Sequence, residues 1–541
     1  MAPEPTALRR RADDLARLAD TPWDVLVVGG GVTGSGILLD ATTRGLAAAL
    51  VEQDDIASGT SSRSSRLIHG GLRYLEQFHV GLVREALSER ARLLVLAPHL
   101  VRLEPLLFPL YGPPLLTRAF YGAGIGMYDL LGSARRGGRA HHLSRASTLR
   151  LAPPLRQPGL QGGILYHDGV EDDARYTLEV ARTAIGLGGV AVTRARAESG
   201  IVESGRLVGL RVHDLQSGTT FEARAKHVID ATGVWAARTD SPFGGARLVP
   251  SRGSHLVVPR ARIPIKQGMT IRVPGKVVFL VPWPEFWLIG TTDAPYDGPP
   301  ERPAASRDEV RRLIDVVNAT LEVDLTAADV VGTYAGLRPL VGEARNGATV
   351  KVSREHRVRV EPDGLVRIGG GKYTTYRVMA RDAVDAALGD SAAARPSRTA
   401  DQKIRGAAPR RDLEALADHL ASTYGLPSAT ASRLVARHGT EAAAVARLGQ
   451  ERDLLGPLVP GRPFIEAEVV WAVREELALS LDDLLSRRLR LSMELPDRGA
   501  SIAGRAAELM GEELGWDPGR RSAEVATYLE SAKREYSVPE L

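Results

Sequence analysis

The chain has 541 residues, more than one hydrophobic core can fill, and its 44% hydrophobic and 25% charged residues indicate a folded globular protein of two or three domains. A dominance of arginine gives a net charge of +5, which indicates either a solvated arginine-rich surface or attraction to anionic lipid or a phosphorylated substrate. Cysteine is absent, which excludes disulfides, zinc–cysteine sites, iron–sulfur clusters and thiolate catalysis, and we expect no metal site.

The first 20 residues contain arginines but no apolar segment behind them. This pattern fits neither a signal peptide nor a twin-arginine leader. No stretch of the chain reaches the roughly 18 apolar residues that would span a bilayer. We therefore expect a cytoplasmic protein.

The first predicted unit is a strand, a glycine turn, a helix and a second strand. Val25 to Val28 is apolar and rich in β-branched residues, as a strand buried on both faces should be. Three glycines then have the spacing G-x-G-x-x-G: Gly29, Gly31 and Gly34. The first permits the turn, the second lets backbone approach a pyrophosphate, and the third lets the helix pack close to the strand.

The second strand of this unit, Leu46 to Val51, ends at an acidic residue, Glu52. This is close to the spacing at which a carboxylate binds a ribose hydroxyl. The order of strand, glycines, helix and acid predicts dinucleotide binding rather than a purely structural turn, but it does not separate NAD from FAD. The next segment, 57–74, is rich in serine, glycine and basic residues without a clean period, so we expect a loop over the cofactor. A nicotinamide enzyme would usually return to a plain helix here.

An apolar segment rich in aromatic residues runs from Leu103 to Leu131. One interpretation places it in the core of a substrate domain. The alternative is a monotopic patch that enters the membrane interface, where Arg118, Arg135 and Arg136 would meet lipid phosphates. The sequence alone does not choose between them.

The middle of the chain alternates strands with helices. Strands and one helix, about Asp172 to Leu187, fit an α/β domain from Gly162 to Ala231. The stretch from about Pro250 to Val330 indicates antiparallel sheet, interrupted by one helix with Ser306 as its N-cap. A second strand–glycine–helix unit then follows, with a strand to Ile368, a triple-glycine turn and a helix from Tyr373 to Leu388.

Beyond about Arg395 the composition shifts to alanine, leucine, arginine and glutamate with helical period. The predicted helices are Arg411 to Leu420, Ala429 to Leu448, Ile465 to Leu479 and Ala523 to Glu535. We interpret this region as a separate helical domain.

Seven segments of the chain resemble the FAD-dependent glycerol-3-phosphate dehydrogenases, membrane-associated enzymes that pass electrons to quinone. They are GTSSRSSRLIHGGLRYL after the first motif, VEDDAR, VIDATGVWA, SRGSHLVVP, WLIGTTD, TYAGLRPL and IGGGKYTTYR. They occur in the family's order from the first strand to about Arg377. A looser resemblance extends into the C-terminal region through EAEVVWAVREELALSLDDLLSRRLRL.

The resemblance implies an α/β fold with three domains. These are a Rossmann-like FAD-binding domain (20–75, 162–245 and 335–395), an antiparallel-sheet substrate-binding domain (76–161 and 246–334) and an all-helical C-terminal domain (396–541). It also implies contacts with FAD. The expected FAD-binding residues are Gly29, Gly30, Gly31, Thr33, Gly34, Glu52, Gln53, Thr60, Ser61, Ser62, Arg66, Leu67, His69, Ala231, Thr232, Gly233, Gly371, Lys372 and Thr374.

For substrate binding, the family's motifs match Arg73, Tyr74, Arg338, Arg354 and Thr292, and for catalysis they match His69, His255, Arg338 and Lys372. Arginine suits a phosphate dianion because its planar fork makes two parallel charge-assisted bonds. His69 and His255 are candidates for the proton acceptor because imidazole titrates near neutral pH, and a lysine or an arginine-bound water could serve instead. The family often has lysine where Arg66 and Arg252 stand, which keeps the charge but changes the geometry.

The resemblance implies oxidation of sn-glycerol 3-phosphate to dihydroxyacetone phosphate, with electrons passed through FAD to a membrane quinone. It also implies peripheral association with an anionic lipid surface at the inner face of the cell membrane, and it allows a homodimer. One alternative is an oxidase that uses oxygen. Another is a non-catalytic, flavin-bound RNA-associated protein, which would need a concentrated basic stripe with exposed aromatics; the arginines are dispersed, so we expect no nucleic acid partner.

Overall fold

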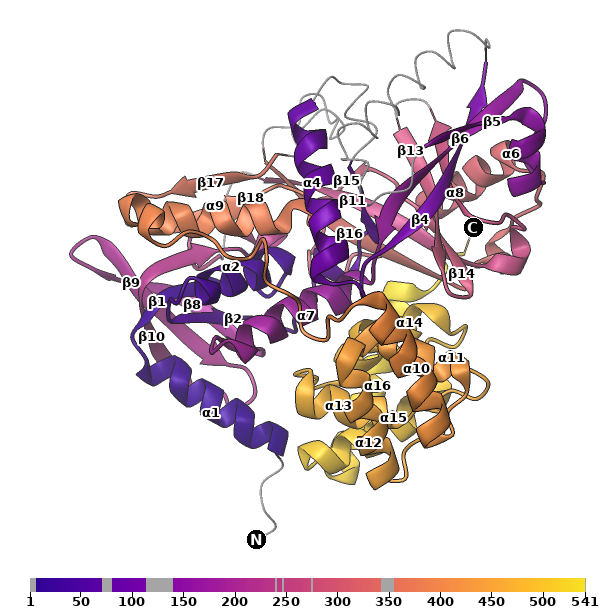
Figure 1. Cartoon of the computed structure of the whole chain (residues 1–541). Helices are drawn as coiled ribbons and strands as arrows, with labels where there is room; N and C mark the ends of the chain where they lie inside the picture. The colour runs from indigo at the N-terminus through magenta and orange to yellow at the C-terminus, as the bar shows by residue number, and fades with distance from the viewer. Residues whose placement is uncertain are drawn as a thin grey trace.

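The structure, a computed structural model, describes residues 6–70, 80–112, 140–238, 241–245, 248–273, 276–341 and 355–540. The strands among these residues form two sheets, and the C-terminal region is helical (Figure 1). In Figure 1 the first sheet lies at the left and the second at the upper right, with the orange and yellow C-terminal helices below the second. The expected combination of an α/β unit, an antiparallel sheet and a helical domain is confirmed.

The first sheet is built around a parallel core in the order β17-β18-β10-β1-β2-β7, with β8 and β9 extending from β10. Strand β1 pairs in parallel with both β10 and β2, so their carboxyl ends share one edge, where ligands bind in open α/β sheets. The bounds are β1 (Trp23–Val28), β2 (Ala48–Val51), β7 (Val190–Val192), β8 (Ala195–Glu203), β9 (Arg206–Asp214), β10 (Thr220–Asp230), β17 (Arg357–Val360) and β18 (Val366–Gly369).

Helices α2 (Val32–Thr43), α7 (Asp173–Gly186) and α9 (Tyr376–Leu388) pack together beside this sheet, with α2 between the other two (Figure 1). Helix α1 (Thr6–Asp20) contacts β7 and β10. The predicted helix from Asp172 is confirmed, because Asp172 caps α7 by accepting the Arg175 N–H. Helix α4 (Val80–Leu96) stands between the two sheets in Figure 1.

The second sheet follows the order β15-β11-β14-β13-β12-β4-β6-β3, with β16 on β11 and β5 on β6. Its pairs are antiparallel except β12 with β4. Helix α8 (Arg307–Thr320) packs on it and begins with the predicted Ser306 cap, while α6 (Arg145–Leu151) lies against β6. The strand bounds are β3 (Leu67–Ile68), β4 (Arg102–Tyr111), β5 (His141–Ser144), β6 (Leu160–Val170), β11 (Leu248–Pro259), β12 (Gly268–Val273), β13 (Lys276–Trp283), β14 (Phe286–Gly290), β15 (Ala294–Pro295) and β16 (Gly332–Val341).

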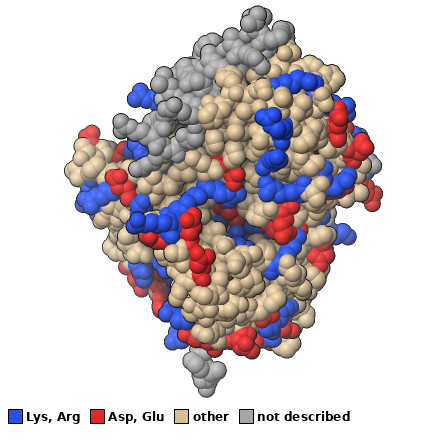
Figure 2. All heavy atoms as spheres, turned by 45° about the vertical axis from the view of Figure 1, so that its right-hand side comes forward, with Lys and Arg blue, Asp and Glu red and all other residues tan. Residues whose placement is uncertain are grey.

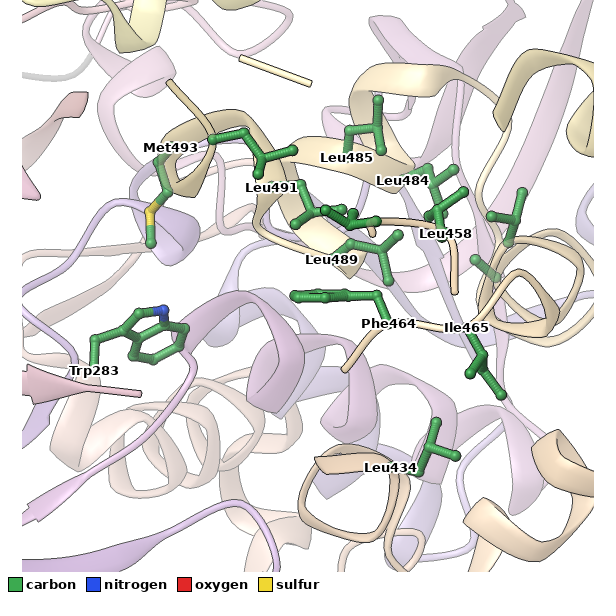
Figure 3. Close-up of a cluster of buried hydrophobic side chains, with 14 of the residues drawn as sticks. Trp283, Leu434, Leu458, Phe464, Ile465, Leu484, Leu485, Leu489, Leu491 and Met493 are labelled. Carbon is green, nitrogen blue, oxygen red and sulfur yellow. The ribbon is translucent and has the colours of Figure 1, made fainter. Parts of the chain in front are cut away.

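The C-terminal domain comprises six α-helices longer than one turn, a π-helix at Asp483–Arg488 and the short α14 (Leu491–Glu494). Its core is continuous with that of the second sheet: Figure 3 shows Met493 pointing towards Trp283 of β13, beside a leucine-rich cluster around Phe464. The longer helices are α10 (Arg410–Tyr424), α11 (Ser428–His438), α12 (Ala442–Glu451), α13 (Ala467–Glu475), α15 (Ala500–Leu514) and α16 (Pro518–Tyr536).

The structure corrects three sequence predictions. Strands β6 and β16 were expected in the FAD-binding domain, but their hydrogen bonds to β4 and β11 place them in the second sheet. The single helix expected over 429–448 is divided into α11 and α12 at Gly439, which has a φ of +57° and lies against Gly406. Helix α15 was not predicted.

The apolar segment that begins at Leu103 is described only as far as Gly112. This part forms β4, and Phe108 is buried within it, as the core interpretation expects. The remainder to Leu131, and with it Arg118, Arg135 and Arg136, lies outside the described residues. Within the described ranges, none of the helices combines the length and the hydropathy needed to cross a bilayer.

The close contact at the third glycine of the first turn gives a stability test. A Cβ at Gly34 would lie 1.9 Å from the Gly29 carbonyl oxygen, whereas one at Gly504, on an exposed face of α15, meets nothing within 4 Å. We expect Gly34→Ala to lower the free energy of unfolding by about 2 kcal/mol or more and Gly504→Ala to raise it by up to about 1 kcal/mol. Urea unfolding followed by circular dichroism measures both; equal stability of the two variants would contradict the close packing.

Candidate active site

A cavity of about 500 Å³ lies between the two sheets. The first sheet contributes the turns after β1, β10 and β18 and the start of β8, while the second contributes Gly253, His255, Gly336 and Arg338. The sequence-predicted residues that line it are Gly29, Gly31, Thr33, Glu52, Gln53, Thr60, Ser61, Leu67, His69, Ala231, Thr232, Gly233, His255, Arg338, Gly371, Lys372 and Thr374. Residues that are far apart in the sequence therefore meet at one site.

The first glycine turn has the conformation and the crowding that its sequence predicts. Gly29 has a φ of +109°, and a Cβ there would lie 2.7 Å from the Ala231 carbonyl oxygen. Gly31 is the N-cap of α2, and the Val32 N–H donates to Ser61 Oγ at 2.9 Å. The amides of a first helical turn have no partner within the helix, so this end of α2 suits the pyrophosphate of a dinucleotide.

Glu52, at the end of β2, is buried at the wall of the cavity. Its Oε2 accepts the Gly30 N–H at 2.6 Å and its Oε1 accepts the Asp54 N–H at 2.7 Å. A carboxylate has about four lone-pair sites, so these two bonds leave acceptor capacity for a ribose hydroxyl. Burial raises the pKa of Glu52 to about 7, although the two backbone hydrogen bonds stabilise the carboxylate and lower the pKa.

The second glycine turn meets the end of β3. Gly370 and Gly371 both have positive φ, +75° and +82°, and Lys372 then begins a 3₁₀ turn at Tyr373–Thr375. The His69 N–H donates to Thr374 Oγ1 at 3.3 Å, which brings His69 and Lys372 to the same part of the cavity. A helix N-terminus beside a lysine is suited to negative charge on the isoalloxazine end of a flavin.

His255, on β11, is held on three sides. Its ring stacks on Tyr334 of β16 at a centroid distance of 4.6 Å, and its Nε2 hydrogen-bonds Ser65 Oγ at 2.8 Å. A Cβ at Gly290, its partner on β14, would lie 2.1 Å from the ring. Burial, and then the charge of Arg338, lower the pKa of His255 to about 3. The imidazole is therefore neutral at neutral pH, which differs from the titration near neutral pH expected of a histidine at this position from the sequence.

Arg338, on β16, projects from the second sheet at the cavity wall. Its Nη2 donates to Thr291 Oγ1 at 3.0 Å and to the Thr292 carbonyl oxygen at 3.2 Å. A Cβ at Gly253, on the neighbouring strand, would lie 2.4 Å from that nitrogen. Because Gly253 has no Cβ, the guanidinium of Arg338 fits beside its backbone.

Comparison with known proteins gives the family of the chain. Residues 24–387 match the model of the FAD-dependent oxidoreductases, and residues 397–521 match the C-terminal domain of alpha-glycerophosphate oxidase. A glycerol-3-phosphate dehydrogenase of Mycobacterium leprae is 44% identical over 96% of this chain and 90% of its own length. The chain belongs to the FAD-dependent glycerol-3-phosphate dehydrogenase family. FAD is its cofactor.

Other relatives agree with this assignment. The human mitochondrial glycerol-3-phosphate dehydrogenase is 36% identical over 96% of this chain and 74% of its own. The Bacillus halodurans glycerol-3-phosphate dehydrogenase, solved with FAD, is 28% identical, with a TM-score of 0.80 and 98% of both chains covered. An L-alpha-glycerophosphate oxidase of Mycoplasma pneumoniae, 19% identical with a TM-score of 0.53 over 68% of this chain and 95% of its own, shares the fold.

The structure places several predicted site residues outside the cavity lining. Thr292 is buried outside the lining, where its hydroxyl donates to Glu309 Oε1 at 2.7 Å and accepts the Ser254 N–H at 2.9 Å. These two bonds join β11 to α8, and substrate contact by Thr292 stays a prediction. Gly30, Gly34 and Ser62 belong to the surrounding backbone but do not line the cavity.

Arg66 also differs from its predicted role as a cofactor contact. Its side chain is fully buried, with the guanidinium carbon 3.9 Å from the Trp283 ring centroid and Nε 3.9 Å from Asp173. It points into the junction with the C-terminal domain, where its Nη2 donates to Met493 Sδ at 3.0 Å. Arg252 pairs with Glu309 at 2.9 Å. The predicted Arg73, Tyr74 and Arg354 lie outside the described residues.

Other lining residues were not predicted, among them Arg63, Ser64, Ser65, Arg196, Trp235 and Arg238. Trp235 lies in the matched segment VIDATGVWA, directly after the Gly233 turn, so the motif gave a signal. Its Nε1 is buried without a hydrogen-bond partner among the described residues, as expected of a donor that faces a ligand. Arg196 lies in an ordinary alternating strand, where no local pattern distinguishes it.

The raised pKa of Glu52 predicts a pH effect on the stability of the FAD-free protein. The folded state keeps the Glu52 proton up to about pH 7, whereas the unfolded chain loses it near 4.5. Folding therefore becomes less favourable as pH rises through this window, by about 3 kcal/mol from this group. We expect Glu52→Gln to gain stability relative to wild type between pH 5 and 7.5 in urea unfolding. A stability difference that does not change with pH would contradict the raised pKa.

Proposed function

We propose that this dehydrogenase oxidises sn-glycerol 3-phosphate to dihydroxyacetone phosphate and passes the electrons to a membrane quinone. The observation that supports it is the pairing of Arg338, a phosphate-binding type of side chain, with the neutral imidazole of His255 on one wall of the cofactor cavity. The names of the relatives point to the same substrate. FAD, when bound, supplies the hydride acceptor.

Arg338 is the proposed phosphate-binding residue. Thr291 and Thr292 fix one nitrogen of its guanidinium, so the planar fork is oriented before substrate arrives. A phosphate dianion can accept two parallel bonds from such a fork. Arg73, Tyr74 and Arg354 remain predictions for the same subsite.

His255 is a proposed proton acceptor, and His69 remains the other candidate. A base must be neutral before it takes the hydroxyl proton, and burial keeps His255 neutral at working pH. Its Tyr334 stack and Ser65 bond fix the ring. A bound phosphate dianion nearby would favour the protonated imidazole and so raise its basicity when substrate is present.

The electron acceptor distinguishes the two leading functions. An oxidase that uses oxygen stays a candidate because residues 397–521 match a domain named for alpha-glycerophosphate oxidase. A quinone acceptor and a peripheral position on anionic lipid are part of the proposal, as is the possible homodimer. An RNA-associated role is less well supported, since Lys and Arg are interspersed with Asp and Glu on the face in Figure 2.

The phosphate role of Arg338 predicts a change in substrate affinity without loss of cofactor. We expect Arg338→Ala to raise KM for glycerol 3-phosphate about 100-fold or more and Arg338→Lys about tenfold, because a charge without the fork keeps part of the interaction. FAD content should stay at wild-type level. Arg260→Ala, at the far end of β11, is the control and should leave KM unchanged. Loss of flavin from Arg338→Ala would move this residue to the cofactor site.

The acceptor is tested on the reduced protein. Glycerol 3-phosphate added without air should bleach the yellow flavin, and a soluble quinone analogue should restore the colour much faster than dissolved oxygen. Stopped-flow absorbance measures both re-oxidation rates. Rapid peroxide formation would favour the oxidase, while salt-sensitive RNA binding without bleaching would favour the non-catalytic alternative.

A further inference from the structure

The segment 52–65, here called the cofactor loop, forms one wall of the FAD cavity but is held from outside by the C-terminal domain. Apart from one 3₁₀ turn at Thr60–Ser62, it has no regular structure. Its lining residues are Gly59 and polar side chains such as Gln53, Ser58 and Ser64. Such a segment has little apolar surface with which to fix its own conformation.

The strongest contact is a fully buried fork between Asp55 of the cofactor loop and Arg488. Arg488 Nη1 donates to Asp55 Oδ2 at 2.7 Å and Nη2 donates to Oδ1 at 2.8 Å. Arg487 Nε donates to Oδ2 at 2.6 Å. All three side chains are at most 3% exposed. A buried carboxylate needs such partners, so Asp55 can hardly leave this position while the C-terminal domain is docked.

The backbone around Arg487 and Arg488 departs from a regular α-helix where these residues reach Asp55. Arg487 and Arg488 end the π-helix, where the Leu489 N–H reaches Leu484 O at 2.8 Å, and π-turns are rare and concentrate at functional sites. Arg490 then has a φ of +67°. Its Nη2 donates to the Ser62 carbonyl oxygen at 2.8 Å and to Asp173 Oδ1 at 2.6 Å.

Asp173 extends this contact further along the cofactor loop, since its Oδ2 accepts the Ser64 N–H at 2.8 Å. A third contact joins Arg63 to Glu535 of α16 at 2.7 Å. Ser65, the last residue of the cofactor loop, hydrogen-bonds His255. A shift of the cofactor loop would therefore move both a wall of the FAD cavity and the support of His255.

We propose that Arg488 and Arg490 are positioning residues for FAD: the helical C-terminal domain retains the cofactor by holding the cofactor loop through Asp55, Ser62 and Asp173. Neither arginine lines the cavity. By linkage, FAD binding also stabilises the docked position of the C-terminal domain. The inference concerns FAD alone and does not depend on the substrate.

The test follows FAD release from the full-length holoenzyme. Arg488→Lys keeps the charge but removes the fork, and we expect FAD to dissociate about tenfold faster or more, measured by the fluorescence of released FAD well below the melting temperature. Arg433→Lys is the matched control in the same domain. Arg433 pairs with Glu468 at 2.7 Å and packs on Phe464, away from the cofactor loop. It should lower the melting temperature but leave FAD release unchanged.

Glu535→Gln is a milder second variant, useful if Arg488→Lys fails to fold. It keeps the shape of the side chain and removes the charge that holds Arg63, so FAD release should accelerate by a smaller factor. The proposal is overturned if the folded variants of Arg488 and Glu535 release FAD at the wild-type rate. It is also overturned if Arg433→Lys accelerates release as much, because that would indicate general loosening.

Discussion

A polar, irregular segment lies at the centre of this protein, and its backbone must find hydrogen-bond partners there. An unpaired buried N–H or C=O costs about as much as a lost hydrogen bond, so a buried loop is normally avoided. Here the Ala57 N–H donates to Gly30 O at 3.0 Å, and Thr60 Oγ1 donates to Leu337 O at 2.6 Å. With the C-terminal arginines on its outer side, the cofactor loop has hydrogen-bond partners in the first sheet, the second sheet and the C-terminal domain. The docking of these three parts is consequently coupled to the position of this wall of the FAD cavity.

The second sheet makes space for its functional side chains by placing glycine beside each of them. A Cβ at Gly290 would meet His255 at 2.1 Å, one at Gly253 would meet Arg338 at 2.4 Å, and one at Gly336 would meet the Arg63 carbonyl oxygen at 2.6 Å. Glycine weakens a strand, because it costs backbone entropy and packs no side chain. The sheet therefore accepts a loss of local stability where an imidazole, a guanidinium and the cofactor loop approach its backbone.

Local patterns predicted the parts of the site that depend on neighbouring residues. The Gly29–Gly34 turn, the Ser306 cap of α8 and the position of Glu52 follow from residues that are close together in the chain, and each lies where expected. The role of Arg66 depends on residues more than 100 positions away in the sequence, such as Trp283. The sheet to which β6 belongs depends on strand pairing, and several pairings could fit the sequence pattern of β6. The Asp55 contacts to Arg487 and Arg488 span more than 430 residues and left no local signal.

The arginine-rich composition also has an explanation inside the molecule, whereas the sequence suggested a solvated surface or attraction to anionic lipid or a phosphorylated substrate. Arg66, Arg175, Arg488 and Arg490 are among the largest fully buried side chains. Burial, followed by the charge of Arg490, lowers the pKa of Arg66, and at the same position a lysine would lose its proton far more readily. A guanidinium starts from a much higher pKa and can also lie flat on the Trp283 ring. Arginine at this position therefore keeps a positive charge beside Asp173 in a buried junction, which a lysine there would hold less securely.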